Sequence, residues 1–139
     1  MNYSTTSIAE RIKKANKVLL IGNGGSYANA AHIANDLLAC GVPAFTLDAA
    51  SLTASANDYG YETVFARWLS TVGSEGDLLI ALSGSGRSPN ILGAIHAAQM
   101  KKMDHILVTD YLRSQDMQQS EEEQIVLGHE VMRILRDAG

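Results

Sequence analysis

Four short apolar runs divide the chain at regular intervals. They span Lys17–Gly22, Pro43–Asp48, Asp77–Leu82 and His105–Asp110. Each run is apolar at consecutive positions rather than at alternate ones, which is typical of strands that are covered on both faces. The pattern therefore predicts four buried strands of a parallel sheet.

Helical segments lie between and after these runs. Ser26–Ala39 and Tyr61–Val72 carry apolar residues at helical spacing. Ser88–Lys102 opens with a Ser-Pro pair suited to a helix start, and Glu121–Asp137 opens with three glutamates that suit the positive end of a helix. The alternation of strands and helices predicts an α/β fold, a three-layer α-β-α sandwich around a doubly wound parallel sheet.

Length and composition limit the fold and the partners further. The 139 residues are 46% hydrophobic and 19% charged, which fits a single domain over residues 1–139. A formal net charge of -4 argues against nucleic acid as a partner, because phosphate backbones select for clustered Lys and Arg. No fifth apolar run separates Asp110 from the last helix, so we expect the fifth strand to be absent.

Cysteine usage and the lack of long apolar segments indicate a location. The single cysteine, Cys40, allows no internal disulfide and suits a reducing compartment. Residues 1–14 are polar and lack the apolar core of a signal peptide, and no run is long enough to span a bilayer. We expect a cytoplasmic protein with no membrane partner.

Two loops rich in small residues follow the first and third predicted strands. They are Gly22–Ser26 and Ser83–Ser88. In a parallel sheet, ligands bind at the carboxyl ends of the strands, where helices begin. Glycine lets the backbone approach an anion closely, helix N-termini offer free N–H groups, and serine hydroxyls donate to phosphate oxygens. Either loop alone is also compatible with a tight turn, but two such loops at one sheet edge favour a phosphate-bearing ligand.

A nucleotide is the alternative ligand. Gly22 and Gly24 after a strand, and Asp48 at the end of the next, are compatible with a dinucleotide fingerprint. However, Tyr27 stands where the third glycine would fall, and the serine-rich second loop has no place in that motif. A Walker loop is excluded because no G-K-[ST] occurs. We expect no nucleotide cofactor, and NAD binding that tolerates Ser85→Ala would indicate the opposite.

Several segments together resemble the sugar isomerase (SIS) fold, which is flavodoxin-like, and among its members the bacterial phosphoheptose isomerases. These segments are Gly22–Ser26, Ala31–Leu37, Ala56–Tyr61, Gly76–Ser88 and Ile125–Glu130. The resemblance implies a sugar-phosphate isomerase that interconverts sedoheptulose 7-phosphate and D-glycero-D-manno-heptose 7-phosphate through an enediol, in lipopolysaccharide or capsule heptose synthesis. It also implies a homo-oligomer, a tetramer, because family sites are assembled from neighbouring subunits.

The resemblance assigns substrate contacts residue by residue. The hydroxyls that hold the sugar phosphate correspond to Ser26, Ser83, Ser85 and Ser88, with Gly84 between two of them. A loop pair near the sugar hydroxyls corresponds to Asn57 and Asp58. Glu121 stands where the family usually has a Gln that contacts the substrate.

Acid–base and metal chemistry involve a second set of residues. His32 and Asp36 lie four apart on one predicted helix and so point the same way. They match a His and a catalytic Glu of the family, and His129 matches its catalytic His, so the resemblance implies Asp36 and His129 as the acid/base pair. His32, Asp36, Glu121 and His129 together offer two nitrogens and two carboxylates, a set suited to one zinc or another divalent ion per site.

The departures from the family leave a second hypothesis open. Asp36 is one methylene shorter than the family's Glu, and Glu121 replaces Gln. These changes favour a non-catalytic SIS module that binds a sugar phosphate or regulates an assembly. Sugar-phosphate binding without turnover would distinguish this module from an isomerase.

Overall fold

The computed structural model describes residues 2–113 and 116–138. Its elements, in order, are α1 (Asn2–Lys14), β1 (Val18–Gly22), α2 (Gly25–Ala39), β2 (Ala44–Thr46), α3 (Ala49–Tyr59), the 3₁₀ turn η1 (Tyr61–Thr63), α4 (Val64–Val72), β3 (Leu78–Leu82), α5 (Pro89–Met100), β4 (Asp104–Leu107), the 3₁₀ turn η2 (Val108–Tyr111) and α6 (Met117–Ala138).

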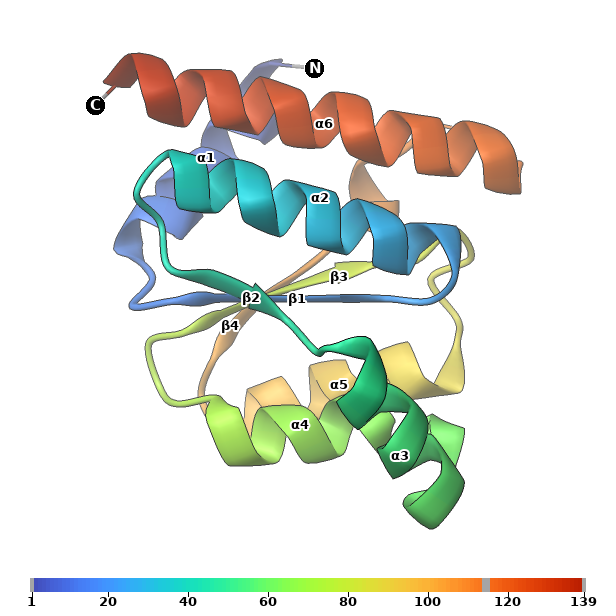
Figure 1. Ribbon diagram of the computed structural model, residues 1–139. Coiled ribbons are helices and arrows are strands. Elements are labelled where there is room, and N and C mark those ends of the chain that lie inside the picture. Colours follow the sequence, from blue (N-terminus) through green and yellow to red (C-terminus); the bar gives the residue numbers. More distant parts are fainter. Residues whose placement is uncertain (1, 114–115, 139) are drawn as a thin grey trace.

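The strands form one parallel sheet in the order β2-β1-β3-β4. Helices α1, α2 and α6 cover one face, and α3, α4 and α5 cover the other (Figure 1). All five residues of β1 and all five of β3 are buried, as the consecutive apolar runs predict. The three-layer, doubly wound α/β fold expected from the sequence is therefore confirmed.

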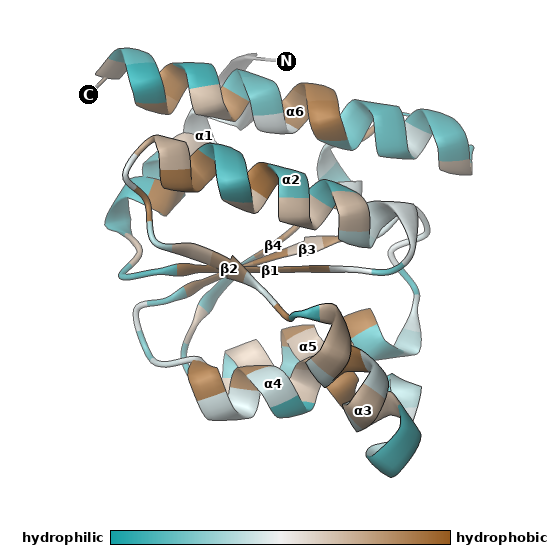
Figure 2. Cartoon of the chain, in the orientation of Figure 1, coloured by the Kyte–Doolittle hydropathy of each residue, from teal (hydrophilic) through white to brown (hydrophobic). Residues whose placement is uncertain are grey.

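The core lies in two layers because successive strand residues point to opposite faces. Leu20 and Ile80 pack under α1, α2 and α6, whereas Leu19 and Leu79 pack against α4 and α5. Figure 2 shows the apolar colour concentrated on the strands and on the helix sides that face them. Each buried leucine contributes roughly 2 kcal/mol through removal of apolar surface from water, so the sheet is a rigid platform for the loops at its edge.

Helix α3 differs from the sequence prediction, which placed a strand up to Asp48 and a loop around residues 57–58. The strand β2 ends at Thr46, and Asp48 instead caps α3 by accepting a hydrogen bond of 3.0 Å from the backbone N–H of Ser51. Gly60, at φ 97°, ends the helix in a conformation that favours glycine. Asn57 and Asp58 therefore belong to the last turns of a helix, and the predicted loop was wrong.

The last strand is shorter than predicted. It ends at Leu107, and Val108–Tyr111 turns into η2, from which the Thr109 hydroxyl donates to the backbone oxygen of Ser83. Among residues 2–113 and 116–138 the sheet has four strands, so β4 is an edge. Arg11 of α1 binds this edge through Asp104, at 2.6 and 2.8 Å, and through the His105 backbone oxygen at 2.7 Å.

Candidate functional site

The carboxyl ends of β1 and β3 lie side by side, because Gly22 pairs with Leu82 in the register. The two small-residue loops start there, and between them lies a hollow of about 60 Å³ that we call the serine hollow. It is lined by Asn23, Ser26, Leu82, Ser83, Gly84, Ser85, Ser88 and Met117. The structure thus brings together five predicted substrate-binding residues, those at positions 26, 83, 84, 85 and 88.

The first loop turns tightly into α2. A Cβ at Gly22 would come within 2.6 Å of the Ser26 backbone, and Gly24 has φ +57°. Glycine is therefore required at Gly22 by close approach and favoured at Gly24 by conformation. The turn buries the Ser26 side chain, which is 3% exposed, in the first turn of α2.

The second loop keeps its hydroxyl protons available. Ser83 Oγ accepts from the Gly86 backbone N–H at 2.9 Å, and Ser85 Oγ accepts from the Arg87 N–H at 3.1 Å. Ser88 precedes α5 without a side-chain capping bond. Because a hydroxyl that accepts still has its own proton to give, these serines can donate to a ligand oxygen.

A reciprocal amide pair joins the two loops. Asn23 Nδ2 donates to Asn90 Oδ1 at 3.0 Å, and Asn90 Nδ2 donates back to Asn23 Oδ1 at 2.9 Å. The Tyr61 hydroxyl also donates to Asn23 Oδ1. Asn90 is 2% exposed and lies in the first turn of α5, so the pair fixes the distance between the loops. The sequence pattern did not predict Asn90 and Tyr61 as site residues, although an Asn directly after the Ser-Pro start of a largely apolar helix is a usable signal.

A second cluster lies between α2 and α6, and we call His32, Asp36 and His129 the His–Asp–His group. The Nε2 atoms of the two histidines are 3.1 Å apart, and they lie 3.3 Å (His32) and 3.7 Å (His129) from Asp36 Oδ2. That carboxylate oxygen is buried and has no hydrogen-bond partner among the described residues. Three potential ligand atoms therefore converge on one point.

This geometry fits a divalent metal ion. Two ligands each about 2.1 Å from a tetrahedral zinc are about 3.4 Å apart, close to the three separations found here. A buried carboxylate oxygen without a donor is costly unless a cation neutralises it. Asp36 and the histidines would supply three ligands and leave a fourth position open, as catalytic zinc sites do. Asp36 Oδ2 and His129 Nε2, the implied acid/base pair, are 3.7 Å apart and lie side by side, so a sugar would contact the pair from one flank.

Glu121 is not part of this group. It lies two turns before His129 on α6, about 12 Å along the helix axis. Its carboxylate lies against Gly25 at the start of α2, where an added Cβ would collide with it. Glu121 also lines a shallow hollow of about 660 Å³ with Asn29, Gln118, Glu122 and Ile125. Within this chain, three of the four predicted metal ligands meet and the fourth does not.

Comparison with known proteins identifies the family. Residues 1–110 match the SIS domain family. The chain belongs to the SIS domain family. The match ends before α6, but solved structures extend the likeness to that helix. The phosphoheptose isomerase from Neisseria gonorrhoeae aligns with a TM-score of 0.83 at 27% identity, covering 98% of this chain and 84% of that one.

Two further relatives agree with this assignment. The structure of a phosphoheptose isomerase from Francisella tularensis aligns with a TM-score of 0.88 at 26% identity, over 97% of this chain and 85% of that one. The phosphoheptose isomerase of Burkholderia pseudomallei (strain K96243) is 49% identical over 100 residues, 66% of this chain and 51% of that protein. This SIS domain therefore spans about half the length of the curated relatives it matches.

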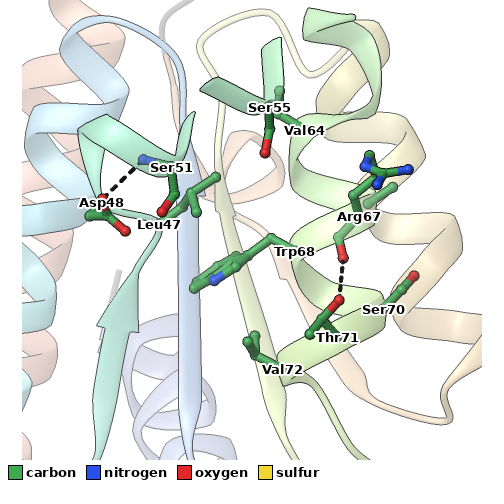
Figure 3. Close-up of a pocket in the computed structure, with 11 residues that line it drawn as sticks. Leu47, Asp48, Ser51, Ser55, Val64, Arg67, Trp68, Ser70, Thr71 and Val72 are labelled. Carbon is green, nitrogen blue, oxygen red and sulfur yellow. Dashed lines mark hydrogen bonds between the residues drawn. The ribbon is translucent and has the colours of Figure 1, made fainter. Parts of the chain in front are cut away.

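Asn57 and Asp58 lie apart from both clusters of the SIS domain. They stand in the last turns of α3, on the other face of the sheet from α2 and α6, where Asn57 Nδ2 donates to Asp58 Oδ1 at 3.1 Å (Figure 1). The same face carries a hollow of about 560 Å³ between α3 and α4, into which the Trp68 indole projects toward Leu47 (Figure 3). That hollow contains none of the predicted site residues.

Over the described residues, no helix is long and apolar enough to cross a bilayer.

Proposed function

We propose that this SIS domain, taken as a single domain over residues 1–139, is an aldose–ketose isomerase. It interconverts sedoheptulose 7-phosphate and D-glycero-D-manno-heptose 7-phosphate, as the likeness to phosphoheptose isomerases suggests. The observation that carries the proposal is that α2 supplies both clusters: Ser26 to the serine hollow, and His32 and Asp36 to the His–Asp–His group. One ligand lying along this helix would contact both.

The serine hollow would hold the phosphate. Ser26, Ser83, Ser85 and Ser88 surround it with hydroxyl donors, and α2 and α5 begin beside it. The partial positive charge of the two helix N-termini favours a dianion there. At about 60 Å³ the hollow suits a group of a few heavy atoms, so the carbon chain of a sugar would extend out of it.

The spacing along α2 suits a seven-carbon sugar. From Ser26, His32 is about 9 Å and Asp36 about 15 Å farther along the helix axis, and helical side chains tilt back toward the N-terminus. In a heptose 7-phosphate the phosphorus and C2 are seven bonds apart, about 9 Å at the roughly 1.3 Å per bond of an extended chain. With its phosphate in the serine hollow, the sugar would place C1 and C2 beside His32, whose Nε2 lies 3.3 Å from Asp36 Oδ2.

Asp36 and His129 would move the protons. Isomerisation of the ketose removes a proton from C1, next to the C2 carbonyl, and returns a proton to C2 through an enediol. Asp36 Oδ2 has no hydrogen bond to give up and can accept the carbon-bound proton, while the His129 imidazole, which can both accept and donate a proton, can carry one between O1 and O2. The side chains are 18% and 36% exposed, so a ligand can reach them.

A zinc ion fits the same three residues. His32, Asp36 and His129 would hold it, and a bound zinc would polarise the sugar carbonyl as a Lewis acid. Glu121 would become a zinc ligand only if α6 moved or if the Glu121 of a neighbouring subunit reached the ion. We therefore assign Glu121 to substrate contact, near the start of α2.

We further propose that the protein acts in the cytoplasm as a homo-oligomer, in heptose synthesis for lipopolysaccharide or capsule. The resemblance to phosphoheptose isomerases implies that this oligomer is a tetramer. The His32 side chain is 51% exposed, so one flank of the His–Asp–His group is open. A neighbouring subunit would close that flank and shield the reaction from water.

The direct test is incubation of the purified protein with sedoheptulose 7-phosphate, with and without added zinc. We expect an aldose 7-phosphate product that increases with protein concentration. Absence of product under both conditions would contradict the isomerase.

The alternative is a non-catalytic sugar-phosphate-binding or assembly-regulating module. It is favoured by the Glu121 carboxylate at the start of α2, where its negative charge opposes a phosphate and where the family resemblance predicts a neutral Gln. Calorimetry that detects sedoheptulose 7-phosphate binding, combined with no turnover, would support this module.

A further inference from the structure

A fully buried amide lies beneath the serine hollow. Gln124 of α6 is 0% exposed, and its Nε2 donates to Ser26 Oγ at 3.0 Å. Its Oε1 accepts from Asn29 Nδ2 at 2.8 Å. Gln124 therefore joins α6 to the first turn of α2 and contacts a hydroxyl that faces the serine hollow.

The backbone oxygen of Glu121 fixes the direction of these hydrogen bonds. Asn29 Nδ2 also donates to the backbone oxygen of Glu121 at 2.9 Å, and a carbonyl oxygen can only accept. The Asn29 amide nitrogen must therefore face Glu121, and its second proton goes to Gln124 Oε1. As a result, the Gln124 nitrogen is the atom that faces Ser26.

Ser26 is left with one proton to give. The Ser26 oxygen accepts a hydrogen bond from Gln124, so its hydroxyl proton needs a different acceptor. No residue within 2–113 and 116–138 accepts that proton. A buried donor without an acceptor costs free energy, and the remaining direction for this O–H is the serine hollow. An oxygen of a bound phosphate would satisfy it.

We propose that Gln124 is a positioning residue that orients the Ser26 hydroxyl as a donor to the sugar phosphate. The inference rests on the proposed function for the identity of the ligand, but not on turnover. Asn29 acts one step further back, because it sets the orientation of the Gln124 amide. A glutamine retained for packing alone would show no dependence on the direction of this hydrogen bond.

The substitution Gln124→Glu tests the direction of the hydrogen bond between Gln124 and Ser26 with almost no change in side-chain volume. The introduced carboxylate can only accept, so Ser26 would turn its proton toward it and away from the ligand. We expect the Kd for sedoheptulose 7-phosphate, measured by calorimetry, to rise about tenfold or more, because a hydrogen bond to a charged phosphate is lost. In turnover assays KM should rise while kcat changes little. Gln99→Glu adds the same charge at an exposed position of α5 and serves as the matched control, with binding unchanged.

A double-mutant cycle separates positioning from damage to the fold. In a Ser26→Ala background, Gln124→Glu should cause no further loss of binding, because the hydroxyl it acts on is gone. Equal losses in both backgrounds, or unchanged binding in the single variant, would overturn the proposal.

Asn29→Asp supplies the same test from a half-buried position, where the fold tolerates change better than at Gln124. The new carboxylate would turn the Gln124 amide around, so that Ser26 donates to Gln124 Oε1. We expect weaker binding than in the native protein, and native binding would count against the relay even if Gln124→Glu failed to fold. The experiments on all of these variants measure binding and not turnover. If the protein binds the sugar phosphate without isomerising it, the isomerase proposal fails, but the role of Gln124 can still be tested.

Discussion

The serine hollow and the His–Asp–His group share helix α2 but differ in how their polar groups are satisfied. Around the serine hollow, backbone N–H groups and buried amides hold the serine oxygens and the loops. In the His–Asp–His group, a buried carboxylate oxygen faces two imidazole nitrogens without a hydrogen bond. The described residues therefore satisfy the oxygens of the first site themselves, whereas they leave Asp36 Oδ2 of the second site without a hydrogen bond.

The largest expected effect separates the two sites by function. Asp36→Asn and His129→Gln each remove a proposed proton-transfer group, and general acid–base catalysis contributes about 10²- to 10⁴-fold to rate. We expect kcat to fall by that range while the Kd for sedoheptulose 7-phosphate changes little, because in the proposal the phosphate binds in the serine hollow. A comparable loss of binding would mean that the two sites are not separate.

Metal binding should affect only the His–Asp–His group. Zinc at about 100 times its Kd would raise the free energy of unfolding by about 2.7 kcal/mol. We expect the Tm to rise on zinc addition and to fall again with a chelator, and His32→Ala should abolish the shift. The same response in His32→Ala would place the metal at another site.

Loss of the amide pair should affect the serine hollow and not the other group. Asn90→Ala removes a buried amide and leaves Asn23 Nδ2 without its acceptor, which costs about 1 to 3 kcal/mol of stability. We expect a lower Tm and weaker binding of inorganic phosphate by calorimetry, with the zinc response retained. The control is Gln99→Ala, at an exposed position of α5. Native phosphate affinity in a folded Asn90→Ala variant would show that the pair does not position the loops.

A smaller effect concerns the charge at the start of α2. Glu121→Gln removes a carboxylate that competes with a phosphate for the positive end of that helix. We expect sugar-phosphate binding to tighten about two- to fivefold, and most at low ionic strength, because salt screens the repulsion. Unchanged affinity at low salt would indicate that the phosphate binds away from α2.

The smallest effect lies at the sheet edge, away from both sites. The hydrogen bond from Arg11 lowers the pKa of Asp104 below its ordinary value of 3.8. Because the folded-state pKa is depressed, the contribution is present above about pH 4 and is lost as the pH falls through the folded pKa. Asp104→Asn should lower stability by at most about 1 kcal/mol at neutral pH, since the pair is partly solvent-exposed, and the variant's stability should change less on acidification below pH 4. Parallel acid-unfolding curves would contradict this.

The sequence predicts those features of the fold and the site that depend on residues close together along the chain. Consecutive apolar residues such as Leu78–Leu82 mark buried strands, and glycine with serine after a strand marks the loops. The four-residue spacing of His32 and Asp36 places them on one face of a helix. Helix α3 was missed because Asp48 was interpreted as the end of a strand, although its side chain caps the next helix.

Other features depend on the packing of distant segments. His129 was included by resemblance, since no spacing along the chain relates it to His32. The relay through Asn29 and Gln124 exists because α6 lies against α2, and the Asn23–Asn90 pair because β1 and β3 are adjacent. Such contacts follow from the three-dimensional arrangement rather than from local pattern.

Isotope exchange would reveal whether Asp36 and His129 move a proton on a sugar that the serine hollow holds. The protein is incubated with sedoheptulose 7-phosphate in D₂O, and the sugar is followed by NMR. The account predicts deuterium at C2 of the aldose product and at C1 of the recovered ketose, lost in Asp36→Asn. Neither deuterium nor aldose after prolonged incubation, with zinc present, would contradict it.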